Sequence, residues 1–155
     1  MRLHFIWVGK TRNEHLRALV DEYLKRLARF VKCETIEVRE SAAQTSAREG
    51  IIEEGKRIIS ALRNDPLTIL LDVEGREWSS MELAHEIERW QIEGRAREVA
   101  FVIGGHRGVS AEVTARSDQR WSLSRMTFTH EMARVLLIEQ IYRAYTIINR
   151  LPYQK

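Results

Sequence analysis

The sequence is poor in the residues that build disulfides, metal sites and membrane spans. It has one cysteine, Cys33, which cannot form an internal disulfide, and no group of cysteines and histidines with the spacing of metal ligands. No apolar run approaches the roughly 20 residues that cross a bilayer, and no secretory signal follows Met1. We therefore expect a cytoplasmic protein that uses neither a membrane nor a metal, with Cys33 packed as a small apolar residue.

The chain also lacks a dense block of basic residues. Its net charge is only +3, and its 25 basic residues are spread along the chain, although 20 of them are arginine. Arginine suits bidentate contacts with phosphate and stacking on bases, so this composition permits an RNA partner. A G+C-rich genome explains the arginine content equally well. The length of 155 residues predicts a single domain, residues 1–155.

Apolar runs and helical patterns alternate along the chain, which is typical of an α/β fold with a mostly parallel sheet flanked by helices. The predicted strands are Leu3–Val8, Thr35–Val38, Leu67–Val73 and Val99–Ile103, followed by a short run at Trp121–Leu123. Five helices are predicted. Asn13, Ser79 and Ser110 are expected to cap the first, third and fourth helices. Ile51 is the first buried residue of the second helix, and His130 begins the last. We expect a loop or helix lead-in over 39–48, a loop over 72–75, and the end of the third helix at Gly94.

Two turns in the last third of the chain form the candidate cofactor site. Ile103–Gly108 is rich in glycine and Leu123–Phe128 contains two serines or threonines with an arginine, and each turn lies between a predicted strand and a predicted helix. Ligands of α/β proteins bind at such turns. The glycine spacing matches neither the dinucleotide fingerprint nor a P-loop, which disfavours NAD and ATP. On spacing alone, a tight turn without a ligand is an equally good interpretation.

The last predicted helix, His130 to Asn149, is apolar around most of its circumference. The terminal helix of a single domain usually leaves one face in water, so we infer that a second subunit covers part of this helix. Its one polar stripe carries Glu139, Arg143, Thr146 and Arg150.

Two histidines and several arginines lie near the turns and the last helix. His106 and His130 could exchange protons near neutral pH, although for His130 we favour a structural hydrogen-bonding role at the helix start. Scattered arginines are more often solvated or ion-paired than bound to phosphate. The arginines that could contact phosphate are Arg107, Arg125, Arg134, Arg143 and Arg150.

Taken together, the motifs of the last third resemble the RlmH family of the SPOUT superfamily, and the resemblance extends over essentially the whole chain. The motifs are Phe101–Gly105, Leu123–Phe128, Arg134–Leu137, Glu139-Gln140, Tyr142–Ala144 and Pro152-Tyr153. The resemblance implies a SPOUT-type α/β fold with a C-terminal trefoil knot, S-adenosyl-L-methionine as the cofactor, and a homodimer built partly on the last helix. The cofactor contacts that it implies are Leu71, Gly104, Leu123, Ser124, Arg125, Met126, Thr127 and Phe128.

The activity implied by the resemblance is methylation of the N3 nitrogen of a pseudouridine in 23S rRNA within the ribosome. For this reaction we assign Glu139 as proton acceptor, Arg143 to phosphate or to the developing anion, and Tyr153 to positioning of the base. An ordinary i,i+4 ion pair explains Glu139 and Arg143 equally well. The family tail usually reads Pro-Tyr-His, whereas this chain has Gln154, which cannot take a proton.

Two alternatives belong to other classes of function. A non-catalytic ribosome- or RNA-binding module could keep the fold and the cofactor pocket, having lost its chemistry through Gln154. A nucleotide-binding oxidoreductase is the weaker alternative, because the glycine spacing argues against it. A Ser-His-Asp hydrolase is poorly supported, because the sequence has no Gly-x-Ser-x-Gly elbow.

Overall fold

The fold is a five-stranded parallel sheet with helices on both faces, as seen in a computed structural model that describes residues 1–42, 44–92 and 97–154. The strand order is β2-β1-β4-β3-β5, and every neighbouring pair is parallel. The strands are β1 (Arg2–Val8), β2 (Lys32–Val38), β3 (Leu67–Glu77), β4 (Glu98–Ile103) and β5 (Gln119–Ser122). The predicted parallel α/β sheet is thus confirmed, whereas the trefoil knot stays a prediction.

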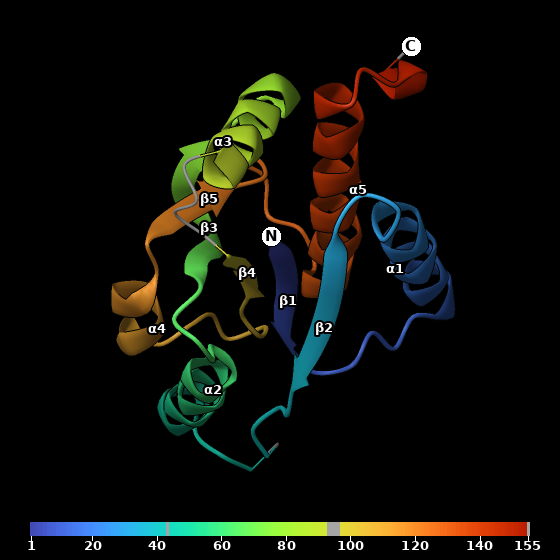
Figure 1. Ribbon diagram of the computed structural model, residues 1–155. Helices are drawn as coiled ribbons and strands as arrows, with labels where there is room; N and C mark the ends of the chain where they lie inside the picture. Colours follow the sequence, from blue (N-terminus) through green and yellow to red (C-terminus); the bar gives the residue numbers. More distant parts are fainter. Residues whose placement is uncertain (43, 93–96, 155) are drawn as a thin grey trace.

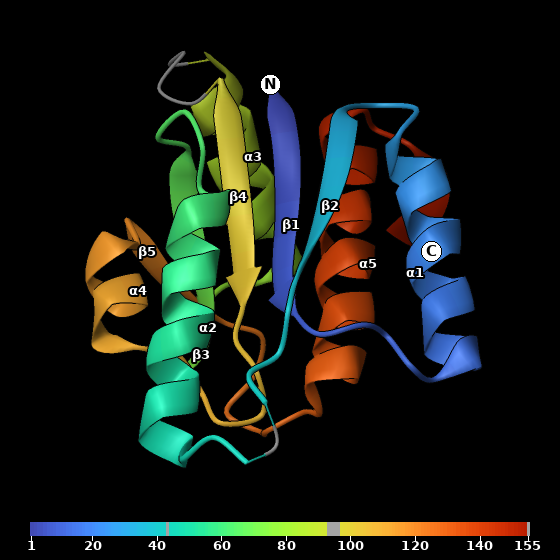
Figure 2. The same ribbon diagram turned by 90° about the horizontal axis from the view of Figure 1, so that it is seen from below.

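The helices divide between the two faces of the sheet (Figures 1 and 2). One face packs against α1, α3 and α5 around a core that includes Leu3, Phe5 and Phe101. The other face packs against α2 and α4 through Ile58 and Val113. The helices are α1 (Glu14–Leu27), α2 (Ala47–Ala61), α3 (Ser80–Ile92), α4 (Ala111–Arg116) and α5 (His130–Ile148), followed by the 3-10 turn η1 (Pro152–Gln154).

Side-chain caps fix where the helices begin. The Asn13 side chain accepts hydrogen bonds at the start of α1, and Ser110 does so at the start of α4, as predicted. At the predicted start of α3, Ser79 and Glu82 form a capping box, with Ser79 N donating to Glu82 Oε2 over 2.7 Å. A second capping box at Ser46 starts α2 earlier than predicted. The predicted end at Gly94 lies outside the described residues.

Strand β3 is longer than the sequence predicts. The expected loop over 72–75 is wrong, because the strand continues through these residues to Glu77. Its pairing with β5 is irregular: Leu71 and Arg76 both pair with Trp121, so the residues between them bulge. In a bulge of this kind, polar and apolar residues do not alternate as they do in a regular strand. Residues 72–75 therefore have the composition of a loop.

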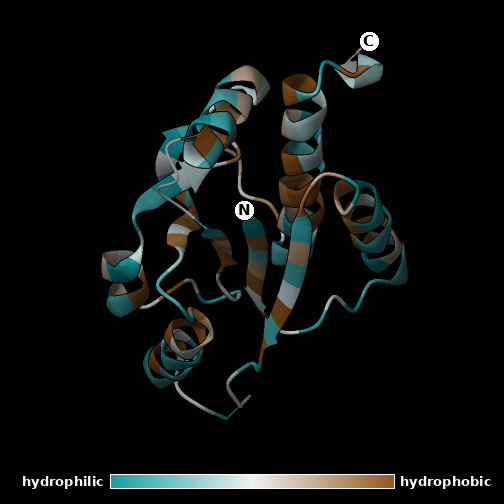
Figure 3. Ribbon diagram, in the orientation of Figure 1, coloured by the Kyte–Doolittle hydropathy of each residue, from teal (hydrophilic) through white to brown (hydrophobic). Residues whose placement is uncertain are grey.

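Helix α5 lies between α1 and α3 and over the sheet (Figure 1). Hydropathy colouring shows apolar residues along most of its length (Figure 3). Neighbours within the same chain bury Val135, Leu137, Ile138 and Ile141 completely or almost completely. Much of the apolar surface that the sequence assigned to a second subunit is therefore covered within one chain.

Cys33 packs against the core on the face of the sheet that carries α1, α3 and α5. Its side chain is half-buried, and burial raises the pKa of its thiol to about 12. The thiol is therefore protonated at neutral pH, and the predicted packing role is confirmed.

Gly75→Ala is expected to lower the free energy of unfolding by about 1–3 kcal/mol, as overpacking does elsewhere. A Cβ atom at Gly75 would lie 2.7 Å from main-chain atoms of Arg120 and Trp121 in β5. Main-chain atoms cannot rotate away as a side chain can, so the bulge itself would have to move. Urea unfolding measures the effect, and the exposed neighbour Glu74→Ala should stay within about 0.5 kcal/mol of the original chain. Equal stability of the two variants would contradict the prediction.

Candidate functional site

A cavity of about 770 Å³ lies at the carboxyl edge of the sheet, where β4 and β5 end, the bulge of β3 begins and α5 starts. All strands are parallel, so their carboxyl ends meet at this edge (Figure 2). The cavity brings together both turns singled out in the sequence. Of the eight cofactor residues implied by the resemblance, seven line it: Leu71, Gly104, Leu123, Ser124, Met126, Thr127 and Phe128.

The eighth implied residue, Arg125, does not line the cavity. Its side chain is 94% exposed, and its Nε atom lies 3.4 Å from Glu77 Oε1. The guanidinium therefore points away from the site into solvent.

The glycine turn presents main chain to the cavity. Gly108 N donates to Gly105 O over 3.0 Å, and Gly108 has a φ of +90°, a conformation that favours glycine. A Cβ atom at Gly104 would lie 2.5 Å from Val109 Cγ1, and one at Gly105 would lie 2.8 Å from Glu54 Oε2. The turn thus requires glycine for its own packing, and its main chain also forms one wall of the cavity.

The second turn is held by its own hydroxyl groups. Ser122 Oγ donates to Ser124 O over 2.9 Å, and Met126 N donates to Ser124 Oγ over 3.0 Å. Thr129 then caps α5 by accepting from Met132 N. The turn leaves the side chain of Met126 71% exposed, so an apolar group stands at the cavity mouth.

The three predicted catalytic residues contact one another. Arg143 donates to Glu139 Oε1 from Nε over 3.1 Å and from Nη2 over 2.8 Å. The Tyr153 hydroxyl donates to the same oxygen over 3.2 Å, and the Arg143 guanidinium lies 4.8 Å from the centre of the Tyr153 ring. Gln140 Nε2 donates to Glu139 Oε2 over 2.6 Å. The i,i+4 ion pair considered in the sequence is therefore present, within a larger cluster.

This cluster of Glu139, Arg143 and Tyr153 lies apart from the cavity of its own chain. Ala133 is the last residue of α5 that lines the cavity, and Glu139 and Arg143 follow it by six and ten residues. At about 1.5 Å per residue, they are roughly 9 and 15 Å further along the helix axis. Tyr153 belongs to η1, which follows the far end of α5 and lies next to the carboxyl terminus marked in Figure 1. Within one chain, the structure does not bring the cluster to the cofactor residues.

Comparison with known families decides what kind of site this is. A family model described as "Predicted SPOUT methyltransferase" matches residues 1–154.

The chain belongs to the SPOUT methyltransferase family.

Its relatives confirm the resemblance to RlmH. A protein from Geotalea daltonii named ribosomal RNA large subunit methyltransferase H is 43% identical over 155 residues, covering 99% of each chain. A protein of the same name from an Anaeromyxobacter species is 40% identical over 155 residues, covering 100% of each chain.

Solved structures show the same SPOUT fold at low sequence identity. A methylase family protein from Haemophilus influenzae has a TM-score of 0.59 and 14% identity, covering 99% of this chain and 70% of its own. A tRNA methyltransferase from Aquifex aeolicus has a TM-score of 0.54 and 15% identity, covering 92% of this chain and 70% of its own.

The cavity of this SPOUT methyltransferase fits S-adenosylmethionine, the cofactor of the family. Its volume lies within the range of about 300–1,000 Å³ that is usual for ligand sites. The side chains of Leu71, Met126 and Phe128 offer apolar surface to an adenosyl group. The main chain at Gly104 and the hydroxyl of Thr127 offer hydrogen bonds to its polar atoms.

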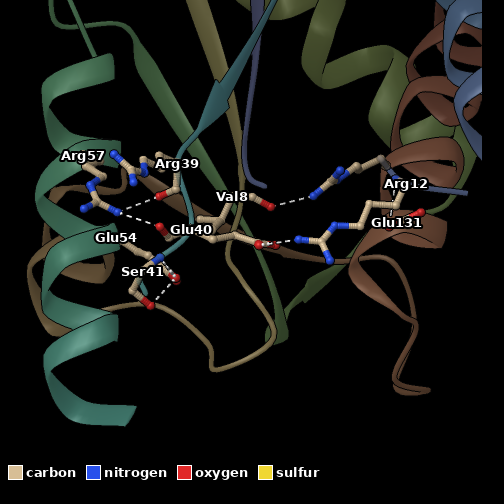
Figure 4. A network of polar contacts seen from close by, with 9 residues as sticks. Val8, Arg12, Arg39, Glu40, Ser41, Glu54, Arg57 and Glu131 are labelled. Atoms are coloured by element: carbon tan, nitrogen blue, oxygen red, sulfur yellow. Dashed lines mark hydrogen bonds and ion pairs between the residues drawn. The ribbon is translucent and has the colours of Figure 1, made fainter. Parts of the chain in front are cut away.

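Sequence reasoning missed the polar network that holds this edge of the sheet together (Figure 4). Arg134 was considered as a phosphate contact, but it is completely buried and donates to Val8 O over 2.6 Å and to Thr11 Oγ1 over 2.8 Å. Glu131 accepts from Arg12 N and Asn13 N, which joins the start of α5 to the start of α1. The sequence did hold a signal for this network. An arginine within an otherwise apolar helix indicates that the arginine is buried and paired with polar groups inside the protein.

The same network reaches the glycine turn from α2. Glu54 is buried, and its Oε1 atom accepts from Ser41 N and Ser41 Oγ, both over 2.9 Å. Its Oε2 atom lies against Gly105. Arg107 of the glycine turn donates to Thr45 O over 3.2 Å. Thr45 lies in the same segment between β2 and α2 as Ser41, so this segment contacts both Glu54 and the glycine turn. The cavity wall therefore depends on residues that do not line it.

Two findings concern sites of other kinds. Within residues 1–42, 44–92 and 97–154, no helix is both long and apolar enough to cross a membrane. In that same part of the chain, no group of three or more His, Cys, Asp or Glu residues is arranged to hold a metal ion.

Proposed function

We propose that this SPOUT methyltransferase transfers a methyl group from S-adenosylmethionine to the N3 nitrogen of a pseudouridine in 23S rRNA, acting on assembled ribosomes in the cytoplasm. The observation that carries the proposal is the cavity at the carboxyl edge of the sheet, lined by seven of the eight implied cofactor residues. The names and full-length coverage of the relatives support ribosomal RNA as the substrate. With a net charge of only +3, the chain suits a preformed ribosomal surface better than free RNA.

When bound, the cofactor supplies a methyl group made electrophilic by its sulfonium. The protein must align this methyl with the ring nitrogen, exclude water and remove the proton from that nitrogen. Main chain at Gly104 and side chains at Leu71 and Phe128 would hold and shield the cofactor. A single domain over residues 1–155 suffices for this cavity.

We propose a homodimer in which the cluster of Glu139, Arg143 and Tyr153 from one subunit serves the cavity of the other. Within one chain the cluster is too far from the cavity to act there. The apolar side chains of Met126 and Met132 are 71% and 38% exposed near the cavity, and a second copy would cover them. Such an arrangement would also bring the tail of the partner toward the substrate.

In this arrangement Tyr153 would position the base and Arg143 would stabilise the anion that develops on it. Burial, and then the hydrogen bond with Tyr23, raise the pKa of Tyr153, so its hydroxyl remains a donor at neutral pH. The role of Glu139 as proton acceptor stays a prediction. Its two oxygens already accept from Arg143, Tyr153 and Gln140, so an incoming proton would compete with these donors.

Methyl transfer to ribosomes tests the proposed function. The protein is incubated with methyl-labelled S-adenosylmethionine and ribosomes that lack the methyl group, in parallel with ribosomes that lack the pseudouridine. We expect label on the first substrate only, mapped to the pseudouridine by mass spectrometry of RNA fragments. A preparation that binds the cofactor and labels neither substrate would instead favour a non-catalytic ribosome-binding module, consistent with Gln154 in the tail.

A further inference from the structure

Only a few side chains in the cofactor cavity can exchange protons. Among the described residues that line it, the ionisable ones are Asp72, His106 and His130. Asp72 is already engaged: Arg120 donates to its Oδ2 atom from Nε over 2.9 Å, and Glu74 N donates to its Oδ1 atom over 3.0 Å. The two histidines are the remaining candidates.

His130 and His106 differ in their surroundings. His106 is exposed in the glycine turn, whereas His130 is half-buried as the first residue of α5, directly after the cap at Thr129. No hydrogen bond joins the His130 imidazole to another residue in the described part of the chain. Its nitrogen lone pair is therefore free to accept a proton from a ligand in the cavity.

We propose that His130 takes the proton from the ring nitrogen that becomes methylated, in the same subunit whose cavity holds the cofactor. This inference rests on the proposed methyl transfer to pseudouridine. It needs no residue from the tail, and so it accounts for chemistry in a chain whose tail carries Gln154 in place of histidine.

Methyl transfer requires the N3 nitrogen to lose its proton. The N3–H bond of the pseudouridine breaks, and its proton moves to an imidazole nitrogen of His130. The electron pair left on N3 forms the bond to the methyl carbon, while the pair of the broken carbon–sulfur bond stays on sulfur. The imidazolium then releases its proton to water, which restores the free base.

The surroundings of His130 keep it in the form that can accept a proton. Burial lowers its pKa from 6.5, and the positive charges of Arg134 on its own helix and of His106 lower it further. The carboxylates of Glu131 and Glu40 oppose this effect without cancelling it. The amino end of a helix also disfavours a positive charge. At pH 7 His130 is therefore neutral.

The test compares His130→Gln with His106→Gln, the matched variant of the other cavity histidine, and with Glu139→Gln. Single-turnover methylation of ribosomes is measured between about pH 5 and 8, the range in which histidine titrates. We expect His130→Gln to slow the step by roughly 100-fold or more, the usual contribution of a general base. The original chain should lose rate as the pH falls through the lowered pKa of His130, below pH 6.5, and His130→Gln should lose this acid limb.

Two further measurements separate catalysis from folding. Calorimetric titration with S-adenosylmethionine should give similar affinities for all four chains, within about threefold, which excludes collapse of the cavity. NMR titration of the imidazole protons, without cofactor or RNA, should show for His130 a resonance with a pKa below 6.5, and this resonance should be missing in His130→Gln. A resonance of His130 that titrates above 7 would overturn the inference.

The outcomes also distinguish this inference from the proposed function. If the original chain methylates ribosomes and His130→Gln keeps both the rate and the acid limb, the inference fails alone. If Glu139→Gln slows the step by roughly 100-fold and His130→Gln does not, the proton acceptor is Glu139 and the inference fails. If the original chain labels no ribosome, the proposed function fails and the inference falls with it.

Discussion

Gly104→Val is expected to weaken the binding of S-adenosylmethionine roughly 100-fold or more, equivalent to about 2.7 kcal/mol. A Cβ atom at this position would lie 2.5 Å from Val109 Cγ1 and 3.1 Å from Gly108 O. Real Cβ atoms do not approach other heavy atoms as closely as 2.5 Å, so either Val109, which also lines the cavity, or the turn itself must shift, and valine adds two more methyl groups. Because the main chain of this turn is a wall of the cavity, the space for the cofactor changes with it.

Isothermal titration with the cofactor measures this effect, and urea unfolding checks that the variant still folds. The control is Arg125→Ala, which should bind within about threefold of the original chain because its guanidinium lies outside the cavity. If a folded Gly104→Val chain bound S-adenosylmethionine as tightly as the original chain, the glycine turn would not be part of the cofactor site. A large loss in Arg125→Ala would mean that this arginine turns inward when the cofactor binds.

The sheet and its helices could be predicted because each signal was local. The apolar runs at β1 and β4 and the caps at Asn13 and Ser110 act within a few residues of the elements that they define. The bulge in β3 could not be predicted, because it depends on how Trp121 of β5 pairs with both Leu71 and Arg76. Polar composition alone does not distinguish a bulged strand from a loop.

The cavity at the carboxyl edge of the sheet was predictable for a similar reason. Ligands bind at the turns that follow buried parallel strands, and two such turns were visible in the sequence. Arg125 shows the limit of that reasoning. It belongs to the second turn, but its side chain points out of the cavity, toward Glu77. Whether a turn residue faces the ligand depends on three-dimensional geometry that spacing does not encode.

The cluster of Glu139, Arg143 and Tyr153 shows which contacts are local in the sequence and which are not. The contact between Glu139 and Arg143 follows from their i,i+4 spacing on a helix. The position of Tyr153 depends on packing against Tyr142, with ring centres 4.8 Å apart, and on a 3.2 Å contact between its hydroxyl and that of Tyr23 in α1. The position of Tyr153 in this cluster was therefore not available from the sequence.

Arg134→Ala is expected to lower the free energy of unfolding by about 3 kcal/mol, since a hydrogen bond to a charged group contributes about 1.5–3 kcal/mol. The side chain is fully buried, donates to Val8 O and Thr11 Oγ1, and places its guanidinium carbon 5.1 Å from the centre of the Trp7 ring. Burial lowers the pKa of Arg134, which reflects a cost of holding its charge away from water. That cost offsets part of the stabilisation from the hydrogen bonds. The expected loss of unfolding free energy is therefore well below the sum of the individual contact energies.

The measurement is urea unfolding, with Arg89→Ala as the control. Arg89 is a half-exposed arginine of α3 that pairs with Glu86, so its removal should cost less than about 1 kcal/mol. Arg134→Lys should fall between the two, because an ammonium keeps the charge but cannot serve both acceptors in the same planar geometry. If Arg134→Ala were as stable as the original chain, the cost of burying the charge would equal the gain from its hydrogen bonds, and the arginine would not stabilise the junction between β1 and α5.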